Sequence, residues 1–150
     1  MMRFKYLAMV LALQFFACTD TIDSPIPNIP VNLQIDLRNP RYLSLQTIGG
    51  VLMLEGGYRG IIVYHKNINE YAAYDRACAY QTTDTCAYVK TDSAMSSVGC
   101  KCCASRYQLY DGVPIKGPAN SGLRTYQTSI SNDYLLIYML LQYLITQTLL

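Results

Sequence analysis

Hydrophobic and polar positions alternate along much of the chain. In residues 31–37, VNLQIDL, every odd position is apolar and every even position is polar, which predicts a strand with one face on a core. Further short segments rich in β-branched and aromatic residues predict strands at 51–54, 60–64, 70–74, 107–110, 124–128 and 134–138. Turn residues separate them at 49–50, 56–57, 67–69, 111–112 and 132–133. The pattern predicts an all-β domain, a small antiparallel sandwich or barrel.

One segment departs from the strand pattern. Asn39 is followed by Pro40 and by residues 41–43, RYL. Asparagine favours the capping position of a helix, and proline is well tolerated at the first helical position. We therefore expect a short helix here.

The N-terminus has the features of an export signal. Arg3 and Lys5 precede an apolar run at residues 7–16, and Ala17-Cys18 follows. The run is too short to span a bilayer. Its end resembles a bacterial lipoprotein processing site, so we expect residues 1–18 to be a lipoprotein signal peptide ending at a lipidated Cys18. The alternative is a plain secretory signal with an incidental cysteine. We expect an exported protein of the bacterial cell envelope, facing the periplasm or the surface and anchored to the membrane by this lipid.

Composition indicates one domain between two appendages. Residues 19–30 hold three prolines and little to bury, which indicates an extended tether. Residues 31–137 form the predicted domain. Residues 138–150 are uncharged and largely apolar; we expect an added strand, with a partner-binding segment or a tail on the membrane as alternatives. The net charge of +2 and the scattered basic residues argue against nucleic acid as a partner.

Five cysteines, all between residues 78 and 103, offer the most specific chemistry. They are Cys78, Cys86, Cys100, Cys102 and Cys103. Thiols at this density indicate either a metal site or disulfides. Cys78 directly follows one predicted strand and Cys100 to Cys103 precede another, so we expect both groups on loops that meet at one tip of the domain. An oxidising, exported location favours disulfides.

The order of these residues resembles the Rieske iron–sulfur domain. Residues Cys78–Tyr80 stand where that family has Cys-x-His, and Cys100–Ser105 stand where it has Cys-Pro-Cys-His-Gly-Ser. Downstream, Tyr107, Asp111–Gly112 and Gly117–Ala119 match the family's aromatic residue, turn and Gly-Pro-Ala loop. The resemblance runs from about residue 31 to residue 137, the extent of the predicted domain. It implies an antiparallel Rieske-type fold with two cysteine-bearing loops at one tip.

Both histidine ligands of the family are replaced. A Rieske cluster binds one iron through two cysteine thiolates and the other through two histidines. Here Tyr80 and Cys103 occupy the two histidine positions. The single histidine, His65, ends a predicted strand well before the first loop, and we expect it to be a partly exposed strand-end residue rather than a ligand.

The first hypothesis is a Rieske-like domain without the standard cluster. The resemblance implies a disulfide between Cys86 and Cys102, and Cys78 has Cys100 or Cys103 as a further partner. One thiol is left over, free or paired with another molecule. On this hypothesis the protein holds no cofactor and acts as a disulfide-stabilised structural or binding module. We favour it because the expected compartment is oxidising.

Two alternatives keep a metal. In one, Cys78, Cys100, Cys103 and Tyr80 hold a [2Fe–2S] cluster, and the added negative charge lowers the potential of an electron-transfer protein. In the other, thiols hold zinc, for which the spacing of Cys100 and Cys103 is suitable. We rank zinc last, since Cys78 with Cys86 makes only a loose second pair.

The remaining chemistry is weak. In the family, residues at the places of Ser105 and Tyr107 donate hydrogen bonds to cluster sulfurs and raise the potential; without a cluster they are ordinary loop and strand residues. No nucleophile has a histidine within motif reach, so we expect no enzymatic activity. Fourteen tyrosines and no tryptophan fit either good strand formers or a contact surface for an envelope protein or a glycan.

Overall fold

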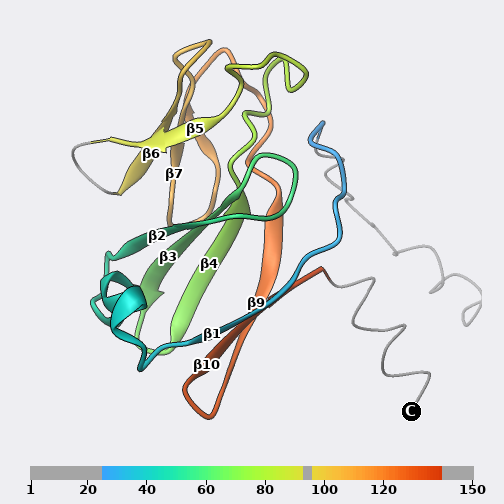
Figure 1. The fold of residues 1–150 in the computed structure, drawn as a ribbon. Helices are drawn as coiled ribbons and strands as arrows, with labels where there is room; N and C mark the ends of the chain where they lie inside the picture. The colour runs from blue at the N-terminus through green and yellow to red at the C-terminus, as the bar shows by residue number, and fades with distance from the viewer. Residues whose placement is uncertain (1–24, 93–95, 140–150) are drawn as a thin grey trace, which may run out of the picture.

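The computed structural model describes residues 25–92 and 96–139. The predicted signal peptide, the predicted lipidation site at Cys18, part of the predicted tether and most of the C-terminal extension lie outside these residues. The described chain forms ten strands and one 3₁₀ helix, arranged as two antiparallel sheets (Figure 1). The predicted all-β class is therefore confirmed. Within the described residues, no helix is long and apolar enough to cross a membrane.

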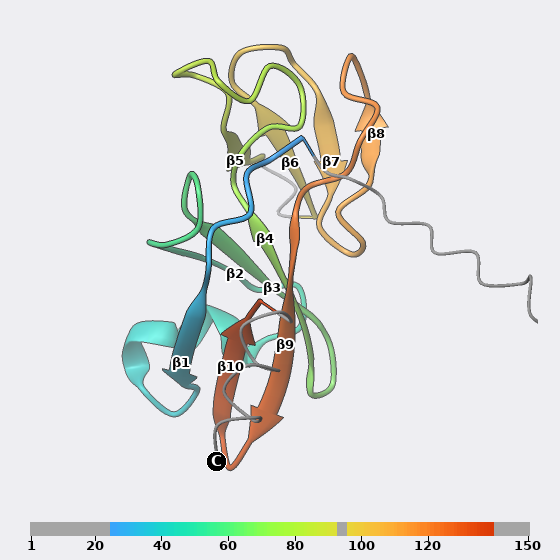
Figure 2. The same cartoon turned by 90° about the vertical axis from the view of Figure 1, so that its right-hand side faces the viewer.

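The larger sheet has six strands and holds one of the two cores. Its order is β1 (Asn32–Asp36), β10 (Tyr134–Tyr138), β9 (Thr125–Ser131), β4 (Glu70–Asp75), β3 (Ile61–Asn67) and β2 (Val51–Leu54). Inward positions alternate as predicted, so that Ile35 of β1 lies opposite Leu135 of β10, and both are buried. Ile61 and Val63 of β3 face the same core. Figure 2 shows β1, β10 and β9 side by side.

The predicted helix is present as the 3₁₀ helix η2 (Pro40–Gln46). The Asn39 side chain accepts a hydrogen bond from the Arg41 amide at 3.0 Å, and Pro40 opens the helix. η2 extends beyond the predicted residues to Gln46 and includes Leu45, whose side chain is fully buried in the core of the larger sheet. Burial of Leu45 explains the extra turn.

The smaller sheet has four short strands. Its order is β5 (Val89–Thr91), β6 (Ser97–Cys100), β7 (Arg106–Gln108) and β8 (Pro114–Lys116). It lies at one end of the larger sheet in both views (Figures 1 and 2). A second core joins the two sheets, with Ile62 and Tyr74 on one side and Val98 and Tyr107 on the other.

Two sequence expectations were wrong. Cys100 was expected on a loop, but it is the last residue of β6, paired with Val89 and 6% exposed. His65 was expected to be partly exposed, but it is only 7% exposed. The strand continues to Asn67, so His65 shares the inward face of β3 with residues 61 and 63. Three- and four-residue strands such as β5 and β6 are too short to show a period in the sequence.

Three buried tyrosines predict a loss of stability in alkali. Burial raises the pKa of Tyr74, Tyr107 and Tyr126 above the ordinary value of 10.0. Because the pKa of each tyrosine is higher in the folded than in the unfolded state, its contribution to the free energy of unfolding is complete at a pH below the unfolded pKa. That contribution is lost as the pH rises through and beyond the unfolded pKa. We therefore expect the urea midpoint to fall above about pH 10, together with a rise in phenolate absorbance. A midpoint that stays constant well above that pH would contradict the prediction.

Candidate functional site at the cysteine tip

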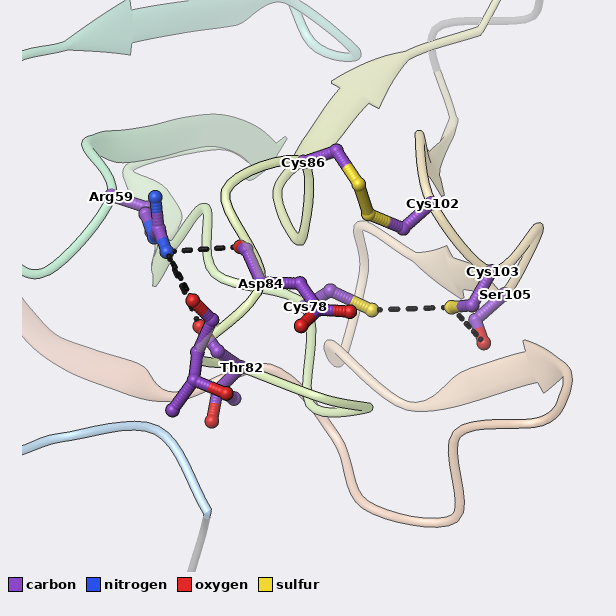
Figure 3. Close-up of a disulfide and its surroundings, with 9 residues drawn as sticks. Arg59, Cys78, Thr82, Asp84, Cys86, Cys102, Cys103 and Ser105 are labelled. Atoms are coloured by element: carbon purple, nitrogen blue, oxygen red, sulfur yellow. Dashed lines mark hydrogen bonds between the residues drawn. A yellow bond between two sulfur atoms is a disulfide. The ribbon is translucent and has the colours of Figure 1, made fainter.

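The cysteines lie at the far end of the smaller sheet, on two loops and, for Cys100, at the end of β6. The first joins β4 to β5, and the second joins β6 to β7. A disulfide between Cys86 and Cys102 connects them, with the two Cα atoms 5.4 Å apart (Figure 3). This is the pair that the resemblance implied. The loops therefore do meet at one tip.

Three thiols remain free beside the disulfide, so the expected further bridge from Cys78 to Cys100 or Cys103, with one thiol left over, is not formed. The sulfur atoms of Cys78, Cys100 and Cys103 are all within 4.8 Å of one another. Cys78 and Cys100 are buried and Cys103 is half-buried. Cys78 Sγ lies 3.5 Å from Cys103 Sγ, as the dashed line in Figure 3 marks. Tyr80, the other replaced histidine position, is 37% exposed.

Two hydroxyl groups point at these sulfurs. Tyr107 Oη accepts the amide hydrogen of Ala79 at 3.1 Å and lies 3.3 Å from Cys78 Sγ. Ser105 Oγ accepts the amide hydrogen of Ala119 at 3.0 Å and lies 3.0 Å from Cys103 Sγ. Because each oxygen already accepts from an amide, its own hydrogen is free to be donated to the sulfur. Tyr107 and Ser105 thus contact the sulfurs of Cys78 and Cys103, respectively.

The two thiols in contact differ in acidity. Burial raises the pKa of the Cys78 thiol to about 12, with a further contribution from its hydrogen bond to Cys100. Burial also opposes ionisation of Cys103. Hydrogen bonds from the Ser105 hydroxyl and amide, and from the neighbouring thiols, outweigh that effect and lower the pKa of Cys103 below its ordinary value. Cys103 is thus the more acidic of the two, and it is also the more exposed.

Two residues that sequence reasoning missed hold the first loop in place. The Arg59 guanidinium donates hydrogen bonds to the carbonyl oxygens of Thr82, Thr83 and Asp84 at 3.4, 3.5 and 3.0 Å (Figure 3). Asp75, the last residue of β4, is completely buried and accepts four hydrogen bonds. No local sequence signal marks either residue, because most of their partners lie 16 to 51 residues away.

The residues at the tip do not fit a histidine-ligated cluster. His65 pairs with Tyr71 at the opposite end of β4. Tyr71 and Asp75 are four residue steps apart in the strand, about 13 Å at the usual rise, and Cys78 is farther still along the chain. A metal–nitrogen bond is roughly 2 Å long, so the imidazole of His65 is too far away to coordinate a metal at this tip. Three thiols remain as a set of soft metal ligands.

The architecture is similar to that of solved Rieske proteins. The cyanobacterial plasma membrane Rieske protein PetC3 from Synechocystis PCC 6803 matches with a TM-score of 0.50 and 22% identity, over 73% of this chain and 98% of that one. The chain has a Rieske-type fold. The ferredoxin of carbazole 1,9a-dioxygenase from Nocardioides aromaticivorans IC177 has a TM-score of 0.48 and 16% identity, over 75% of this chain and 99% of that one. No family model matches this Rieske-type chain, and no curated protein matches it.

Proposed function

We propose that the protein is an exported, lipid-anchored module of Rieske-type fold that works without the standard histidine-ligated cluster. The Cys86–Cys102 disulfide stabilises its tip, and the protein acts as a structural or binding module rather than an enzyme. The observation that carries the proposal is the tip itself: a disulfide joins the loops, and Tyr80 and Cys103 stand where imidazoles would be needed.

The disulfide also supports the proposed location. Stable disulfides belong to oxidising compartments, which include the bacterial cell envelope. An envelope location agrees with the lipoprotein processing site expected at Cys18. The proposed partners are the membrane, through the lipid on Cys18, and an envelope protein or a glycan.

The convergence of the three free thiols favours a second candidate, an altered metal centre. Cys78, Cys100 and Cys103 are close enough to bind one metal together, and the hydroxyl groups of Tyr107 and Ser105 lie within hydrogen-bond distance of the Cys78 and Cys103 sulfurs. With Tyr80 as the fourth ligand that the resemblance implies, such a centre would belong to an electron-transfer protein. Tyr80 is 37% exposed, which weakens this candidate.

Metal content and thiol state separate the two candidates. We expect the full-length exported protein, purified without air, to contain neither iron nor zinc and to yield a cross-linked peptide joining Cys86 and Cys102 in mass spectrometry. About two iron atoms per chain with a sulfide-dependent visible band would overturn the proposal in favour of the altered cluster. About one zinc atom per chain would overturn it in favour of a zinc site. In either case, Cys103→Ser should reduce the metal content and leave the disulfide intact.

A further inference from the structure

The free thiols of the cysteine tip form a donor set with three members. Within residues 25–92 and 96–139, no further histidine, cysteine, aspartate or glutamate joins the group of Cys78, Cys100 and Cys103. Cys86 and Cys102 are bonded to each other and therefore offer no thiolate. A metal at this tip thus has three sulfur ligands, all of them soft.

The number of ligands discriminates between metals. A structural zinc site almost always has four protein ligands, and a [2Fe–2S] cluster also takes four. The fourth ligand that the resemblance implies is Tyr80, whose side chain is 37% exposed beside thiols that are buried or half-buried. Cu(I) is a soft monovalent cation that thiolates select. Three sulfurs at the corners of a triangle complete its coordination, so that no fourth ligand is needed.

The spacing of the sulfurs agrees with such a triangle. At a metal–sulfur bond length of about 2.3 Å, three sulfurs around one ion lie about 4 Å apart. The sulfurs of the three thiols are all within 4.8 Å of one another, and Cys78 Sγ lies 3.5 Å from Cys103 Sγ (Figure 3). A central ion therefore requires each sulfur–sulfur distance to change by about 1 Å at most.

Hydrogen-bond donors surround two of the three sulfurs. Cys78 Sγ accepts from the Tyr80 amide and lies 3.3 Å from Tyr107 Oη. Cys103 Sγ accepts from the Ser105 amide and lies 3.0 Å from Ser105 Oγ. Donors of this kind stabilise negative charge on sulfur, and outer partners of metal ligands typically strengthen binding roughly 10- to 100-fold. The tip is thus built to hold thiolates, which a bound cation requires.

We propose that the cysteine tip binds one Cu(I) ion, with the thiolates of Cys78, Cys100 and Cys103 as its three ligands. The ion keeps its oxidation state, because each thiol releases its proton to solvent as the copper–sulfur bond forms. Cys103 is half-buried whereas the other two thiols are buried, so the ion enters and leaves past Cys103. The inference rests on the proposed function, a binding module without the standard cluster, and names its ligand.

Competition with a coloured chelator measures the binding. The full-length protein, purified without air in zwitterionic detergent, is first assayed for iron, zinc and free thiols. It is then added to the Cu(I) complex of bicinchoninate, whose visible absorbance falls as the protein removes the metal. We expect one Cu(I) ion per chain, and we expect copper X-ray absorption to report three sulfur neighbours at about 2.3 Å. Unchanged absorbance, or a copper ion with only two sulfur neighbours, would overturn the proposal.

Two conservative variants identify the ligands. Cys103→Ser removes the half-buried sulfur and should weaken Cu(I) binding at least about a hundredfold, more than the loss of an outer partner. Tyr80→Phe is the matched control, because it removes the phenol that an altered cluster would need and should leave the Cu(I) affinity unchanged. Unchanged affinity in Cys103→Ser, or an equal loss in Tyr80→Phe, would contradict the proposal. If Cys103→Ser fails to fold, the number of sulfur neighbours in the wild-type protein still decides.

The same measurements separate this inference from the proposed function. A protein that holds neither iron nor zinc and takes up no Cu(I) would overturn the inference and leave the proposed function in place. About two iron atoms per chain with sulfide would overturn the proposed function before any copper is added. Zinc that binds the same thiols at least as tightly as Cu(I) would assign the site to zinc and overturn the inference.

Discussion

Replacing Asp75 by alanine is expected to lower the free energy of unfolding by about 3 kcal/mol or more. The carboxylate is fully buried and accepts hydrogen bonds from the amides of Tyr58, Arg59 and Ala77 at 2.5, 3.1 and 2.8 Å. It also accepts the Tyr126 hydroxyl at 2.8 Å. Alanine leaves all four donors without a partner in a place that water does not reach easily.

Gly57 shows how closely the chain packs around the Asp75 carboxylate. This glycine has a φ of +61°, and a Cβ atom there would lie 2.4 Å from both the Asp75 carboxylate and the Tyr126 hydroxyl. No side chain fits in that space, so the orphaned donors of the alanine variant have little room to find new partners. The loss should also loosen the first cysteine loop, because Ala77 directly precedes Cys78.

Urea denaturation followed by circular dichroism measures the effect. Asp111→Ala is a matched control, because Asp111 is exposed and accepts one hydrogen bond, from the Val113 amide. We expect the control to cost less than about 1 kcal/mol. Tyr126→Phe should fall between the two, since it removes one of the four donors. Equal free energies of unfolding for Asp75→Ala and Asp111→Ala would show that the four buried hydrogen bonds of Asp75 stabilise the fold no more than the one exposed hydrogen bond of Asp111.

Removing the Cys86–Cys102 disulfide is expected to cost about 3 kcal/mol of stability. The bridge joins residues 16 apart in the sequence and closes the first loop onto the second. Without it, the unfolded chain gains the freedom that the closed loop had removed. The double variant Cys86→Ala/Cys102→Ala should therefore unfold at lower urea than the wild-type protein.

Reduction provides the control for this prediction. A reducing agent should bring the stability of the wild-type protein close to that of the double variant, and should leave the double variant unchanged. A wild-type protein that loses no stability on reduction would show that the bridge contributes nothing to the fold. Cys86→Ala alone should also expose one additional thiol, at Cys102, in a thiol assay.

The larger sheet could be predicted from the sequence because its strands are long enough to show a period of two. Residues 31–37 alternate without exception, and β1 occupies Asn32–Asp36 within them. In the smaller sheet only β7 overlaps a predicted strand, residues 107–110, whereas β5, β6 and β8, with three or four residues each, were not predicted. A three-residue strand contains no repeat from which a period can be read. Register with a neighbouring strand, rather than local pattern, defines these elements.

The candidate site was predicted in part. The order of the cysteines along the predicted strands led to two loops at one tip, and the resemblance to the Rieske domain implied the pair of Cys86 and Cys102. Asp75 and Arg59 were missed, because a carboxylate or a guanidinium is recognised as an anchor only once its distant backbone partners are known. The expected exposure of His65 was wrong, since burial at the end of a strand depends on which elements close over it.

The sequence by itself determined the all-β class, the resemblance to a Rieske domain and the absence of a second histidine. These follow from local alternation and from residue types at fixed spacings. Only the tertiary structure decided which cysteines lie in contact, how buried each thiol is and where His65 lies. Pairing of β5 with β6 places Val89 opposite Cys100, and so brings the two loops together. Distances between residues far apart in the chain are set by packing of whole sheets, which no local pattern records.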